Sequence, residues 1–177
     1  MVEAYYYAEN DSPMTDAHDS GVSVSLNKLR SVGVYYSQLP TLDSVNELAE
    51  QRHYKNRDVI DLNADTFPGG TKAIQAKLDI FFKEHIHEDE EIRYILQGEG
   101  YFDVRDDQDK WIRVKVEKND MLILPAGIYH RFTLTDKMSV KALRLFKDEP
   151  KWIALNREEG ITEDNKYRKE YVHSVST

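Results

Sequence analysis

From Glu90 onward, the sequence alternates between short runs rich in β-branched and aromatic residues and short polar segments that favour turns. The runs are EIRYILQ, YFDVR, WIRVKV, MLIL, YHRFTL and VKALRLF, with turn-forming residues at 98–100, 106–110, 118–120, 125–127 and 136–137 between them. Many short strands separated by turns every ~8–12 residues are typical of a β-sandwich or a β-barrel. We therefore predict a fold that is mostly β.

The first 82 residues mix short strand-like and helix-like segments and contribute the expected helices. Residues 41–52 form an amphipathic pattern with Thr41 as N-cap, residues 73–82 form another after a break at Gly69 and Gly70, and residues 23–29 offer a Ser-led helical start. Since 177 residues suit one domain and no linker separates the two regions, we expect a single domain over 1–177. Its parts are a flanking region at 1–82, core strands at 83–152 and a loosely held polar tail at 157–177.

Composition excludes several classes of function. The chain has 32 Asp and Glu against 24 Lys and Arg, a formal net charge of −8, so nucleic acid and anionic membranes are poor partners. It has no Cys, which excludes disulfides, zinc knuckles, thiol nucleophiles and iron–sulfur clusters. We find no signal-peptide pattern and no apolar run long enough to span a membrane. We expect a cytoplasmic monomer, with a nuclear fraction as an open alternative.

Two of the six histidines stand close together in the segment EHIHEDEEIRYILQGEG, residues 84–100. His85 and His87 are two positions apart, so on an extended backbone both imidazoles leave the same face. Glu91 and Arg93 share that parity, and Asp89 competes with Glu91 for the same place. A lone His-x-His pair is weak evidence by itself. We interpret His18, His53 and His173, which lie in polar surroundings, as surface residues.

A third candidate histidine follows the turn expected at Pro125 and Gly127. His130 and Phe132 lie on one face of the next strand, although a single histidine there is more often structural than a ligand. Together with the earlier segment, three imidazoles and a carboxylate form a plausible set for Fe(II), Ni(II), Zn(II) or Mn(II). A metal that takes six ligands would keep two positions for the oxygens of one small molecule.

These segments resemble the two motifs of the cupin superfamily. His85-x-His87-x-x-x-Glu91, with six residues before Gly98, matches the first motif, and Pro125-x-Gly127-x-x-His130 matches the second. Two positions depart from the pattern: Asn119 stands where Gly is usual, and Leu134 where Asn is common. Because Asn tolerates a positive φ, we expect the turn at Asn119 to be kept.

The resemblance narrows to the eukaryotic type of the acireductone dioxygenase family. HEDEEIRYILQGEGYFDVRD, WIRV, LPAGIYHRFTL and KALRLFKDEPKW are similar to that family, as are the upstream SLNKLRSVGV and QRHYKNRDVIDL. The similarity covers residues 1–152. It implies a single cupin barrel (a double-stranded β-helix, or jelly roll) that holds one Fe(2+) or Ni(2+) per chain through His85, His87, Glu91 and His130.

The resemblance also implies the reaction. An iron enzyme of this family cleaves acireductone (1,2-dihydroxy-3-keto-5-methylthiopentene) with O2 to 4-methylthio-2-oxobutanoate and formate, in methionine salvage. The nickel form follows an off-pathway cleavage to methylthiopropionate, formate and carbon monoxide. Another cupin metalloenzyme, or a cupin interaction module without catalysis, remains an alternative.

Four further residues are candidates for the substrate site. Arg93 shares the parity of the ligands, and an inward Arg in an apolar barrel needs an anion beside it. Arg144 lies between Leu143 and Leu145, and the family uses an Arg at the matching place. Phe132 and Trp152 are candidates for the pocket wall, with core packing as the alternative. Glu84 has the opposite parity to His85, so we assign it no role as a base.

Overall fold

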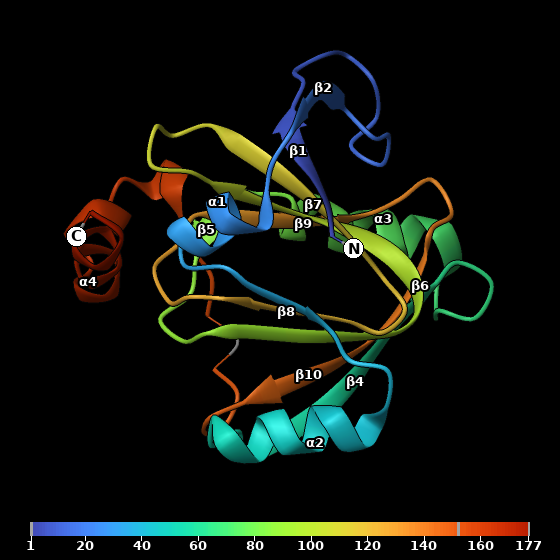
Figure 1. Ribbon diagram of the computed structural model, residues 1–177. Coiled ribbons are helices and arrows are strands. Elements are labelled where there is room, and N and C mark those ends of the chain that lie inside the picture. Colours follow the sequence, from blue (N-terminus) through green and yellow to red (C-terminus); the bar gives the residue numbers. More distant parts are fainter. Residues whose placement is uncertain (1, 152, 177) are drawn as a thin grey trace.

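The computed structural model describes residues 2–151 and 153–176 and consists mainly of antiparallel strands with a few helices. Figure 1 shows two sheets that face each other, with β6 (Glu91–Arg105) passing from one to the other. The first sheet holds β1 (Glu3–Tyr7), β2 (Asp19–Ser23), β5 (His85–Ile86), β7 (Trp111–Glu117), β9 (His130–Leu134) and β11 (Leu155–Asn156). The second holds β3 (Tyr35–Gln38), β4 (Asn56–Asn63), β8 (Asp120–Leu124) and β10 (Ser139–Phe146). The mostly β prediction is confirmed, although the pairings among these residues form an open path rather than a closed ring.

The strand β6 corrects one prediction. Residues 98–100 were expected to form a turn, but β6 continues through them and pairs with β8 and β10 before them and with β7 and β9 after them. The register against β10 shifts between Ile95 and Gln97, which leaves Leu96 as the extra residue of a β-bulge. Gly98 follows two positions later with a φ of +75°. A Cβ on Gly98 would collide with the carbonyl oxygen of Ser139 on β10. Glycine therefore serves here to bend a long strand between two sheets.

The expected helices are present. They are α1 (Leu26–Ser31), α2 (Leu42–Gln51) and α3 (Gly70–Phe81). Thr41 caps α2 as predicted, since its side chain accepts the N–H of Ser44 and the Ser44 hydroxyl oxygen accepts the N–H of Thr41. The turn at Asn119 is also kept, with a φ of +74°. None of the helices within the described ranges combines the length and apolarity needed to cross a lipid bilayer.

Two groups of buried apolar side chains stabilise this arrangement. The larger group draws on both sheets and on α1 and α3, which contribute the fully buried Leu29, Ile74 and Leu78. The smaller group joins Val45 and Ala49 of α2 to the outer face of the second sheet, and Figure 1 shows α2 beside β4 and β10. Burying such side chains contributes roughly 1.5–3 kcal/mol each relative to exposure.

The C-terminal residues differ from the loosely held tail expected at 157–177. They form the short helices η1 (Arg157–Glu159) and η2 (Thr162–Asp164) and the helix α4 (Lys166–Val175). Tyr171 of α4 is buried and donates its hydroxyl to the carbonyl oxygen of Val32 at 2.8 Å. The polar composition misled the prediction because a few buried contacts are enough to hold the segment.

The interpretation of the isolated histidines was wrong for one of them. His53 and His173 are exposed, but His18 is 5% exposed, stacks on Tyr7 with ring centroids 4.6 Å apart, and has both ring nitrogens close to backbone carbonyl oxygens. A polar sequence context therefore did not mean an exposed side chain.

Candidate metal centre

Three histidines and one glutamate meet where the two sheets come together. The potential ligand atoms of His85, His87, Glu91 and His130 all lie within 4.8 Å of one another. His85 on β5 pairs directly with His130 on β9, and Glu91 begins β6, where it pairs with β8 of the second sheet. The sheet junction thus brings together residues from three strands.

Parity left both Asp89 and Glu91 as candidates, and the structure groups Glu91 with the three histidines. The chain does not stay extended from His85 to Glu91, because β5 ends at Ile86 and the backbone bends before β6 starts. Asp89 lies in that bend with an exposed side chain, outside the group of four. The turn between the sheets, rather than one extended strand, decides between Asp89 and Glu91.

All three imidazoles are oriented in the same way by the backbone. In each ring Nδ1 lies within hydrogen-bond distance of a carbonyl oxygen: His85 with Lys83 at 2.6 Å, His87 with Ile153 at 2.8 Å and His130 with Ile128 at 2.9 Å. A carbonyl oxygen only accepts, so each Nδ1 carries the proton and donates it. Each Nε2 is then the nitrogen with a free lone pair, the arrangement found in metal-ligating histidines.

Two buried atoms in the group have no hydrogen-bond partner among the described residues, Glu91 Oε2 and His130 Nε2. They lie 2.5 Å apart, yet the geometry between them is not that of a hydrogen bond. With Nδ1 protonated, His130 Nε2 presents a lone pair to a carboxylate oxygen, and two such atoms repel unless both bind the same cation. The donor set fits a divalent transition metal.

The charges of these groups also suit metal binding. Burial lowers the pKa of His85 to about 3, with the neighbouring imidazoles adding to the effect, and burial lowers the pKa of His87 as well. Burial alone would raise the pKa of Glu91, but the neighbouring Arg93 guanidinium holds it well below its usual value. Near neutral pH the site therefore offers the neutral imidazoles of His85 and His87 and the ionised carboxylate of Glu91.

A cavity of about 240 Å³ opens onto the four side chains. Its polar floor consists of these residues together with Arg93 and Arg144. Its walls and mouth are apolar, formed by Ile60, Leu62, Ile80, Phe81, Ile95, Phe102, Phe132, Val140, Ala142 and Ala154. Such a cavity suits a small molecule with a polar, anionic head and an apolar tail.

Both predicted arginines line this cavity, and each is held by a carboxylate. Arg93 Nη2 lies 2.9 Å from Glu91 Oε1. Arg144 makes two hydrogen bonds of 2.7 Å to Asp58, its direct partner on β4. Nothing in the sequence pattern identified Asp58, because its position opposite Arg144 depends on the pairing of strands far apart in the chain.

The two aromatic candidates have different outcomes. Phe132 lines the cavity and packs against Phe102 and Phe81, with ring centroids 4.8 Å and 6.4 Å away. Trp152 lies outside the described residues. The sequence analysis did not name Phe81. Its position near the end of an expected helix, four residues before His85, could have indicated that it lines the site.

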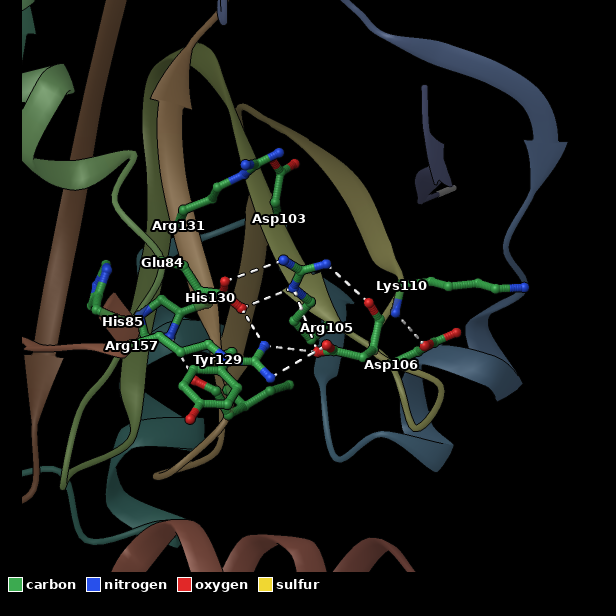
Figure 2. A network of polar contacts seen from close by, with 12 residues as sticks. Glu84, His85, Asp103, Arg105, Asp106, Lys110, Tyr129, His130, Arg131 and Arg157 are labelled. Carbon is green, nitrogen blue, oxygen red and sulfur yellow. Dashed lines mark hydrogen bonds and ion pairs between the residues drawn. The ribbon is translucent and has the colours of Figure 1, made fainter. Parts of the chain in front are cut away.

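Glu84 turns away from the metal ligands, as its parity predicted. Figure 2 shows the guanidinium groups of Arg105 and Arg157 directed at its carboxylate while the imidazole of His85 points elsewhere. Arg105 Nε and Arg157 Nη1 each lie 2.8 Å from Glu84 Oε2. Burial would raise the pKa of Glu84, but these two arginines keep it below its usual value. The Glu84 carboxylate is therefore ionised and binds the two arginines rather than accepting a proton from substrate.

Comparison with known proteins agrees with this geometry. The ARD/ARD′ family model matches residues 3–154. The acireductone dioxygenase of Candida albicans (strain WO-1) is 55% identical over 163 residues, covering 90% of this chain and 92% of that protein. The acireductone dioxygenase of Aspergillus fumigatus is 49% identical over 174 residues, covering 98% and 97%. Both relatives are matched along nearly their whole length.

A solved structure shares the fold. The acireductone dioxygenase from Bacillus anthracis, with a cadmium ion in its active centre, superposes with a TM-score of 0.68 at 23% identity, covering 88% of this chain and 98% of that chain. The cupin fold expected from the two motifs is thereby confirmed.

Proposed function

This chain belongs to the ARD/ARD′ family, and on that premise we propose that it cleaves acireductone with O2 to 4-methylthio-2-oxobutanoate and formate, a step of methionine salvage. The observation that carries the proposal is the convergence of three Nε2 lone pairs and the Glu91 carboxylate at the floor of a cavity with apolar walls. The family accounts for the dioxygenase activity, and the site supports acireductone as the substrate.

We propose that His85, His87, Glu91 and His130 hold one Fe(2+) or Ni(2+) per chain. Imidazole nitrogens with one carboxylate suit both ions, and a six-coordinate ion would keep two positions for substrate oxygens. A bound metal acts as a Lewis acid that lowers the pKa of a coordinated enediol. We propose that the nickel form yields methylthiopropionate, formate and carbon monoxide, as the family resemblance implies.

The chain's own charges support an anionic substrate. Glu91 and Asp58 offset Arg93 and Arg144, and an imidazole binds a metal in its neutral form, so a divalent metal would leave the cavity floor with a net positive charge. The two guanidinium groups bind and orient the enediolate oxygens through charge-assisted hydrogen bonds. The apolar walls, including Phe132, accommodate the methylthio tail and exclude water.

Reconstitution of the metal-free protein tests the proposal. Protein loaded separately with Fe(II) and Ni(II) is mixed anaerobically with acireductone, then exposed to O2, and the products are identified by mass spectrometry. We expect both forms to accelerate decay and to differ in their products. Metal binding without accelerated decay points to another cupin metalloenzyme, and a chain that binds neither ion points to an interaction module.

We further propose a cytoplasmic location, with a nuclear fraction as the alternative, and a monomer that binds no nucleic acid. The net charge of −8 supports the last point. The exposed large apolar side chains of the described residues are scattered over separate elements, which supports a monomer. Sedimentation velocity measures the oligomeric state.

A further inference from the structure

The C-terminal residues, nearly all of them beyond the family match, contact His87 and the residues that precede His85 and His130. We call residues 153–175 the C-terminal strap; the family model ends at residue 154. Two short helices and α4 follow β11 in this segment, and Figure 1 shows α4 set apart from the sheets at one end of the molecule. The part of the strap nearest the ligands is therefore Ile153 to Arg157.

The strap first contacts the strand that carries His85. Leu155 and Asn156 form β11 and pair with Ile86 and His85 of β5. The carbonyl oxygen of Ile153 accepts the Nδ1 proton of His87 at 2.8 Å. The strand β5 is two residues long, and its only register pair with β9 is His85 with His130. Pairing with β9 alone therefore gives β5 few backbone hydrogen bonds. The strap supplies much of the hydrogen bonding that orients β5.

Arg157 stabilises the contact between the strap and β5. Its backbone N–H donates to the carbonyl oxygen of Glu84 at 3.0 Å, and its Nη1 lies 2.8 Å from both Glu84 Oε2 and Asp109 Oδ1. Its guanidinium carbon lies 4.2 Å from the centre of the Tyr129 ring. Glu84 directly precedes His85 and Tyr129 directly precedes His130, so one side chain connects the residues that precede two candidate ligands.

The rest of the strap is anchored on the His130 side. The Tyr129 hydroxyl lies 2.7 Å from Thr162 Oγ1 and 2.6 Å from Glu163 Oε1. Arg168 Nη1 donates to the carbonyl oxygen of Gly127 at 3.2 Å, and a Cβ on Gly127 would collide with the backbone of Tyr167. The strap therefore packs closely on the turn that leads to His130.

We propose that the C-terminal strap positions two histidines for metal binding, His85 through Arg157 and His87 through the carbonyl oxygen of Ile153. The proposal rests on the metal centre of the proposed function. Groups that orient metal ligands typically change metal affinity by about 10- to 100-fold when they are removed. Arg157 acts through Glu84 and the backbone of β5, so it is a positioning residue and does not touch the metal.

The test is metal affinity of the full-length protein, without substrate. Co(II) and Ni(II) are titrated separately into metal-free wild type, Arg157→Gln and Arg157→Lys, and metal release into excess chelator is timed. We expect Arg157→Gln to weaken Co(II) binding by about tenfold or more and to speed release. Arg157→Lys should recover part of the loss, because an ammonium group keeps the charge but reaches fewer acceptors.

A matched control separates this role from a general effect on stability. Lys83 Nζ pairs with Glu158 Oε1 at 3.4 Å between the same two segments, but both side chains are exposed, so Glu158→Gln should bind both ions like wild type. Glu84→Gln should weaken binding as Arg157→Gln does. The double variant should lose little more than either one, since the two substitutions remove the same contact.

The outcomes distinguish the two proposals. If Arg157→Gln binds and releases Co(II) like wild type, whether or not its melting temperature falls, the positioning role is refuted and the metal centre stands. If wild type binds neither ion, the metal centre is refuted and the strap proposal with it. If Arg157→Gln fails to fold, Arg157→Lys replaces it in the comparison with wild type. The positioning role is then refuted if both Arg157→Lys and Glu84→Gln bind and release Co(II) like wild type.

Discussion

Arg93 and Arg144 stand directly opposite each other on β6 and β10, two like charges side by side on the floor of the cavity. Glu91 flanks Arg93 and Asp58 flanks Arg144, so four charged side chains form a row from the metal ligands to the edge strand β4. Each carboxylate offsets the repulsion between the arginines. The row makes Asp58 the partner that keeps the Arg144 guanidinium in place.

Replacing Asp58 should weaken substrate binding. In Asp58→Asn, Arg144 loses a bidentate charged partner worth about 1.5–3 kcal/mol, so we expect KM for acireductone to rise about tenfold with a smaller change in kcat. Steady-state kinetics of the metal-loaded protein measure this split. Asp61→Asn, an exposed residue on the same strand, is the control and should leave both constants unchanged. Equal effects of the two substitutions would contradict the role of Asp58.

Removing a ligand should abolish metal retention. His85→Ala and His130→Ala each delete one of four ligands, so we expect the purified proteins to hold little metal after dialysis. Elemental analysis measures the content, and the exposed His53→Ala serves as the control. Arg93→Ala should keep its metal and lose turnover. A stoichiometric metal content in either histidine variant would remove that residue from the ligand set.

Glu99 provides a pH-dependent contribution to stability away from the metal centre. Burial raises its pKa, but Lys137 at 2.6 Å and Lys115 at 3.4 Å outweigh this and lower the pKa below its usual 4.5. Because the folded-state pKa is the lower one, the stabilisation is present above about pH 4.5 and is lost as the pH falls through the folded-state value.

Glu99→Gln should therefore cost about 1 kcal/mol of unfolding free energy near neutral pH, and the difference from wild type should shrink as the pH falls below 4.5. Urea unfolding at several pH values measures it. Glu117→Gln is the matched control, since Glu117 also contacts Lys115 but is exposed. A difference that stays constant with pH would show that the ion pairs do not contribute.

The left-handed backbone of Gly98 in β6 predicts that glycine is needed at this position. Gly98→Ala combines a left-handed backbone with a Cβ that collides with Ser139, so we expect a loss of about 3 kcal/mol or more. Gly21 has a similar φ of +80° but open space around it, so Gly21→Ala should cost only about 1–2 kcal/mol. Thermal unfolding compares the two, and equal losses would mean that β10 yields to the new side chain.

Much of the site could be predicted from the sequence because the residues that indicate it lie close together in the chain. His85 and His87 lie within one short segment, Pro125, Gly127 and His130 lie in another, and Thr41 caps its own helix. Long-range contacts were missed for the opposite reason. Asp58 and Arg144 are 86 positions apart, and nothing in the sequence around either residue indicates that the other is its partner.

The sequence by itself determined the residue types that offer lone pairs to a metal, the turns that carry them and the strand-rich character of the chain. Only the tertiary structure decided that β6 continues through Gly98, that Glu91 rather than Asp89 joins the three imidazoles, and that a polar C-terminal segment packs against β5. His87 and the carbonyl oxygen that orients it are 66 positions apart, and Glu84 and Arg157 are 73 apart. Side-chain chemistry and turn propensity act between near neighbours, whereas contacts over such separations form only when both sheets and the strap are packed together.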